Sequence, residues 1–180
     1  MRGEAVPAWA SWVGTVAVVL GVLLTAERGT EWMKQVVIAN ATPVSGQLPD
    51  AECPTDELIE EGLSAAECEQ LVANVRNHIV SAPPWFPGVQ TLLAATATIL
   101  ALLSIGVGAS LLEGRAWAPG AAVYTFGALA LVDAAGFVAA VNAGPILRDA
   151  YLWGFLLWFF IHLMMTIGVA AGRAGVIRHG

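Results

Sequence analysis

The stretch that decides the fold is residues 89–112, which read VQTLLAATATILALLSIGVGASLL and contain no charged residue. At 1.5 Å per residue, a helix of this length spans the roughly 30 Å of hydrocarbon in a lipid bilayer. Three further stretches are comparably apolar, at about residues 9–26, 119–141 and 146–171. The sequence therefore predicts an all-α integral membrane protein with four transmembrane helices in an antiparallel bundle.

The composition agrees with this prediction. Of the 180 residues, 57% are hydrophobic and 12% are charged, and the mean hydropathy is +0.70. A soluble domain carries about 25% charged residues, so too few charged groups are present to cover a water-facing surface. Aromatic residues near the predicted span ends form two belts of the kind found at membrane interfaces. One belt holds Trp9, Trp12 and Trp117, and the other holds Trp32, Trp85, Tyr151 and Trp153.

The chain divides into three regions. Residues 1–26 hold the N-terminus and the first span, residues 27–87 form a long loop, and residues 88–180 hold three spans and a short tail. Short connections between the last three spans make these helices antiparallel neighbours. The first span could instead be a secretory signal peptide, but Glu4 and the flanking tryptophans favour a transmembrane helix.

Three short helices are predicted in the long loop. Thr30 can cap a helix from Glu31 to about residue 39, and Thr55 can cap another that ends near residue 61. Ser64 and Glu67 have the spacing of a capping box, in which each side chain bonds the other residue's backbone N–H. The helix that they open should end before Pro83, because proline cannot continue a helix. We therefore expect a small helical domain outside the membrane.

The loop is acidic and holds the only two cysteines. Between Glu27 and Pro87 the chain carries ten acidic and three basic residues, which gives this segment a net charge of −7. Nucleic acid is excluded as a partner, since phosphate binding needs a basic surface. Cys53 and Cys68 are expected to form a disulfide, although two reduced thiols are the alternative. A disulfide requires an oxidising compartment, so we expect the termini in the cytoplasm and the chain in a bacterial inner (plasma) membrane.

Asp133 and His162 interrupt the third and fourth spans. An ionisable residue inside a membrane is costly and indicates a function by default. The two residues lie at similar depths and could meet if their helices present the right faces. They could satisfy each other structurally, handle protons or a ligand, or meet a basic residue of another membrane subunit. No second histidine lies at the depth of His162, so we expect neither a metal nor a cofactor.

An acidic face of the loop is the candidate docking surface for a partner protein. It consists of four carboxylates between the cysteines, Asp56, Glu57, Glu60 and Glu61. The regular ligand spacing and central glycine of a calcium loop are missing. The alternative to docking is a face that is simply solvated.

Three functional hypotheses follow, and none includes a recognisable catalytic motif. The first is a non-catalytic accessory or assembly subunit whose acidic loop docks an extracytoplasmic or membrane protein, with lipid as its other partner. The second is a redox or proton-coupled membrane component that binds a quinone-like ligand near Asp133 and His162. The third is a small transporter or channel subunit, for which the few charged residues inside the spans are thin evidence.

Overall fold

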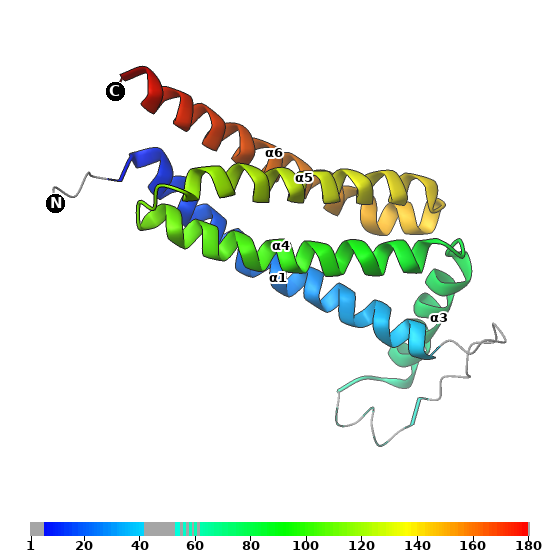
Figure 1. The fold of residues 1–180 in the computed structure, drawn as a ribbon. Coiled ribbons are helices and arrows are strands. Elements are labelled where there is room, and N and C mark those ends of the chain that lie inside the picture. Colours follow the sequence, from blue (N-terminus) through cyan, green and yellow to red (C-terminus); the bar gives the residue numbers. More distant parts are fainter. Residues whose placement is uncertain are drawn as a thin grey trace.

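The computed structural model describes residues 6–41, 53–54, 56, 58, 60 and 62–179. All regular structure in these residues is helical, and four helices are long and apolar enough to cross a membrane. The helices are α1 (Ala8–Ala41), α3 (Ala65–Ser81), α4 (Phe86–Leu112), α5 (Ala118–Asn142) and α6 (Pro145–His179) (Figure 1). The predicted fold class, an all-α protein with four membrane-spanning helices in a bundle, is confirmed.

The last three spans are joined by tight turns. Gly114 lies between α4 and α5 with φ +69°, and Gly144 lies between α5 and α6 with φ +99°. Only glycine adopts such positive φ values without strain. Proline stands in the first turn of α4 and of α5, where its missing N–H costs no helix hydrogen bond. These short turns make α4, α5 and α6 successive antiparallel neighbours, as predicted.

The bundle is held together mainly by two close helix pairs, α1 with α4 and α5 with α6, and α4 also packs on α5. Small residues bring α1 and α4 together, because a Cβ added at Gly14 would lie 2.8 Å from the carbonyl oxygen of Gly108. Ser104 donates a hydrogen bond of 3.4 Å to the carbonyl oxygen of Ala17. The contact between α1 and α6 is the sparsest of the neighbouring pairs of long helices. A seam therefore remains between these two helices.

The first helix is longer than the sequence suggested. Instead of ending near residue 26 and restarting at Glu31, α1 runs without a break to Ala41. Thr30 does not cap a new helix, because its hydroxyl donates to the carbonyl oxygen of Ala26 one turn earlier. Gly29 is the only helix-disfavouring residue in this stretch, and its cost of about 1 kcal/mol is too small to end a helix. Helix α6 likewise continues past residue 171 to His179.

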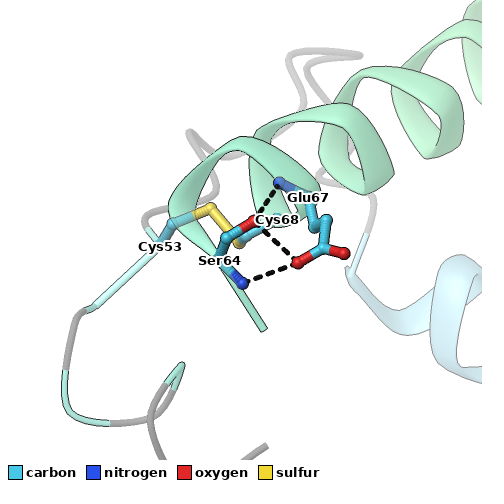
Figure 2. Close-up of a disulfide and its surroundings, with 4 residues drawn as sticks. All are labelled: Cys53, Ser64, Glu67 and Cys68. Carbon is cyan, nitrogen blue, oxygen red and sulfur yellow. Dashed lines mark hydrogen bonds between the residues drawn. A yellow bond between two sulfur atoms is a disulfide. The ribbon is translucent and has the colours of Figure 1, made fainter. Parts of the chain in front are cut away.

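The loop helix α3 lies at the end of the bundle opposite the two termini (Figure 1). The predicted capping box is present: the N–H of Ser64 donates to Glu67 at 2.8 Å, and the N–H of Glu67 donates to the Ser64 hydroxyl at 3.3 Å. A disulfide joins Cys53 to Cys68 in the first turn of α3 (Figure 2), which confirms the predicted bridge. Helix α3 ends at Ser81, before the two prolines, as expected.

Candidate functional site

Three ionisable side chains meet in the interior of the bundle. Asp133 of α5 is 1% exposed, His162 of α6 is 3% exposed and Arg28 of α1 is 5% exposed. Asp133 follows Phe126 and Leu129 on the inward stripe of α5, at the three- and four-residue spacing of one helix face. Because Asp133 occupies a position in this inward stripe, its carboxylate lies in the interior of the bundle.

Asp133 is hydrogen-bonded on both of its oxygens. The Arg28 Nη2 donates to Oδ1 at 3.3 Å, and Nδ1 of His162 lies 2.7 Å from Oδ2. The structure thus brings Asp133 and His162 into contact, which the sequence analysis had given as possible if their helices present the right faces. The basic partner of Asp133 is Arg28 of the same chain, whereas one of the alternatives had assigned it to another subunit. One carboxylate therefore ties α5 to both α1 and α6.

Aromatic residues of α6 enclose this Arg28–Asp133–His162 cluster. The Arg28 guanidinium lies 4.5 Å from the centroid of the Phe155 ring, an attractive cation–π geometry. The indole of Trp158 stacks on the His162 ring at 5.6 Å between centroids. The same indole donates its N–H to Glu27 at 2.9 Å. The Phe155 ring thus holds the Arg28 side chain, and the Trp158 indole contacts both the His162 ring and the Glu27 carboxylate.

A second polar contact joins α1 to α6 nearer the α3 end. Oε1 of Glu31 accepts hydrogen bonds from the Tyr151 hydroxyl at 2.8 Å and from the Gln35 amide at 2.9 Å. Together with the bond between Trp158 and Glu27, this contact crosses the seam between the two helices. The seam is therefore bridged by polar side chains where its apolar packing is sparse.

An open groove with a volume of about 520 Å³ lies along this seam. Its wall carries both signs of charge, with Glu27 and Glu31 opposed by Arg28 and Lys34. Arg28 is the one member of the cluster that also lines the groove. Its Nε–H is buried and makes no hydrogen bond within the described part of the chain. The full lining is Ala26, Glu27, Arg28, Thr30, Glu31, Lys34, Ala150, Tyr151, Gly154 and Phe155.

Sequence reasoning missed the contribution of α1 to this site, because it assigned residues from 27 onward to the loop. The signal was present in the spacing of Leu24, Arg28, Glu31 and Gln35, which repeats at four, three and four residues. Such spacing puts all four side chains on one helix face. Gln90 of α4 was also missed; its side-chain amide is buried without a hydrogen-bond partner among the described residues.

The predicted docking face is only partly described. Asp56 and Glu60 are exposed, whereas Glu57 and Glu61 fall outside the described residues. The pKa of Glu67 lies below its ordinary value of 4.5, because the hydroxyl and the N–H of Ser64 both donate to its carboxylate. In the described part of the chain no three His, Cys, Asp or Glu side chains gather in a way that could hold a metal ion.

Comparison with family models, with curated proteins and with solved structures finds no match for this chain. Any functional conclusion therefore rests on the geometry of the site itself.

Proposed function

We propose that the chain is a membrane protein that binds the polar head of an amphipathic, quinone-like ligand in the groove between α1 and α6. The observation that carries this proposal is the double position of Arg28, which lines the groove and bonds the buried Asp133. A ligand that contacts Arg28 is thereby coupled to the Asp133–His162 pair. Ionisable residues at membrane depth are typical of such sites.

Stability alone is a poor explanation for the cluster. Burying an arginine and an aspartate costs desolvation free energy that their attraction barely offsets, and apolar residues of similar volume often stabilise a protein as well or better. Here Glu27 and Glu31 add two further carboxylates beside the pair. The concentration of ionisable groups on one seam is therefore better explained by a ligand than by folding.

The groove has the chemistry to hold a ring that carries carbonyl or hydroxyl groups. Tyr151 supplies aromatic surface, and Arg28 and Lys34 supply donors for a carbonyl oxygen. Glu31 can accept a hydrogen bond from a ligand hydroxyl. Because the seam is open and loosely packed, an apolar tail can extend from the groove into the surrounding lipid.

The residues take distinct roles in this proposal. Arg28 donates to the ligand, while Asp133 and His162 act as positioning residues that hold the guanidinium in place. Glu31 and Tyr151 share a hydrogen bond at the groove wall, which holds the Glu31 carboxylate where it can accept a hydrogen bond from a bound hydroxyl.

The test is purification in mild detergent, followed by solvent extraction and mass spectrometry of the extract, and by titration with a short-chain quinone. Tyr151→Phe removes the hydroxyl that holds the Glu31 carboxylate in the groove, and it should weaken binding about tenfold if Glu31 then loses its hydrogen bond to the ligand. Tyr124→Phe is the matched control, because Tyr124 is 81% exposed on the outer face of α5. Equal binding by both variants, or no binding by the unmodified chain, would reject the proposal.

A second candidate function is that of an accessory subunit that docks a basic protein partner through α3. The observation in its favour is that α3 projects from the end of the bundle (Figure 1). Apart from Cys68 and Val72, every described side chain from residue 65 to 77 is exposed, and Leu71 is 53% exposed. A 17-residue helix is marginally stable without packing, and a partner with basic and apolar groups would complement this surface.

Co-purification separates this candidate from the first. Glu69→Lys on α3 should release a basic partner, whereas Glu113→Lys at the other end of the bundle should not. A chain that purifies alone from its native membrane, with no protein cross-linked to α3, would count against docking.

We also propose a bacterial inner membrane with both termini in the cytoplasm. The support is that a disulfide is typical of an oxidising compartment and that α3, which holds Cys68 of the bridge, lies at the end opposite the termini (Figure 1). An alkaline phosphatase fused to the C-terminus should be inactive, since this enzyme needs an oxidising compartment to fold. An active fusion would reverse the orientation.

A further inference from the structure

We infer that the terminus-bearing end of the bundle holds a site for the phosphate of an anionic phospholipid. This inference is independent of the ligand groove, which lies toward the opposite end. It rests on a second cavity, with a volume of about 560 Å³, where the start of α1, the α4–α5 turn and the last turns of α6 meet.

Two arginines supply positive charge at this cavity. Arg115 comes from the α4–α5 turn and Arg173 from α6, and the lining contains no acidic residue. Arg173 makes no ion pair with the residues that the structure describes. Arg115 contacts Glu113 at 2.8 Å, but both side chains are about 60% exposed. An exposed ion pair contributes little free energy, so a phosphate can replace this carboxylate.

The remaining lining is suited to a lipid rather than to a free anion. Val6, Ala10 and Leu111 line the cavity with apolar surface, which can accept the upper part of an acyl chain or the glycerol backbone. Trp9 and Trp117 flank it, and tryptophan is typical of the headgroup region of membranes. Trp9 also brings an indole N–H that is buried and makes no hydrogen bond to the described residues.

The position in the fold adds a third argument. The cavity lies at the ends of the four membrane-spanning helices, at the level where lipid headgroups meet the protein. Basic residues at this level attract anionic lipids. A cavity that combines two arginines, two tryptophans and an apolar wall therefore fits a phospholipid that carries a net negative charge.

The test is native mass spectrometry of the full chain, titrated with phosphatidylglycerol or with phosphatidylcholine. Phosphatidylglycerol should bind more tightly, and Arg173→Gln and Arg115→Gln should each weaken its binding about fivefold. Glu113→Gln removes the competing carboxylate and should strengthen binding. Arg148→Gln is the matched control, because it removes the same charge at the opposite end of the bundle.

Any of three outcomes would overturn the inference. Equal binding of the two lipids would mean that the site does not recognise a net negative charge. An equal loss in Arg148→Gln and Arg173→Gln would indicate a diffuse charge effect without a site. If millimolar inorganic phosphate displaced phosphatidylglycerol completely, the cavity would bind a free anion and not a lipid.

Discussion

Asp133 occupies the interior of the bundle because two other helices each bring one donor to its carboxylate. Arg28 and His162 bond different oxygens, so neither partner replaces the other. A buried charge that loses its partner is much costlier than a pair that is absent from the start. The three residues should therefore behave as one unit when they are substituted.

This coupling predicts the outcome of a double-mutant cycle. Asp133→Leu alone leaves the Arg28 guanidinium buried without its carboxylate partner and should lower the free energy of unfolding by about 3–5 kcal/mol, and Arg28→Met alone completes the set of single variants. Arg28→Met combined with Asp133→Leu removes both charges and should cost less than the single change at Asp133. Thermal unfolding in detergent measures the differences. Additive effects of the two substitutions would mean that the ion pair is not the coupling contact.

At the scale of single elements, the support of Arg28 by α6 depends on a small residue of α5. A Cβ at Gly136 would overlap the ring of Phe155, which carries the guanidinium on its face. Gly136→Ala should displace this ring, destabilise the bundle by about 1–3 kcal/mol and weaken binding in the groove. Gly127→Ala serves as the control, since a Cβ there meets no atom within 4 Å. If both variants unfold alike, Phe155 does not need the space at Gly136.

The capping box of α3 predicts a dependence on pH. The pKa of Glu67 is lowered from 4.5 because Ser64 donates to the ionised carboxylate. A lowered folded-state pKa means that the cap stabilises α3 above pH 4.5 and loses this effect as the pH falls through the folded value. Hydrogen exchange of the first turn of α3 should therefore quicken in mild acid. In Glu67→Gln, the exchange rate of these amides should follow pH only as the intrinsic exchange chemistry does. If the variant keeps the pH response of the unmodified chain, the cap is not the cause of that response.

The length and apolar composition of residues 89–112, 119–141 and 146–171 were enough to predict the last three helices of the bundle, and the prolines and the capping box were enough to predict α3. The length of α1 was not predictable in the same way. Glu27, Arg28 and Glu31 have the composition of a loop, yet they lie on α1 and bond Trp158, Asp133 and Tyr151 respectively. The candidate site was half predicted for this reason: Asp133 and His162 stand out in apolar spans, while Arg28 lies among charged residues and is indicated only by its spacing from Leu24 and Glu31 on one helix face.

At the scale of the whole molecule, the chain consists of a tightly packed bundle and a small loop domain that touches it lightly. Apart from its contact with α6, helix α3 packs little against the long helices. Its stability must come largely from local devices, the capping box and the disulfide. The two parts are therefore expected to lose structure separately.

Reduction of the disulfide tests this separation. The bridge joins residues 15 apart, and closing a loop of this size contributes about 3 kcal/mol in the chain-entropy model. A reductant, or the variant Cys68→Ser, should expose the segment around residues 53–81 to protease. The bundle should keep its melting temperature, because none of its interhelical contacts involves a cysteine. Limited proteolysis measures the exposure of this segment, and thermal unfolding measures the stability of the bundle. A fall in the melting temperature of the whole chain would contradict the separation. Such a fall would show that α3 and the bundle form one cooperative unit, so that a partner bound to α3 could act on the groove between α1 and α6.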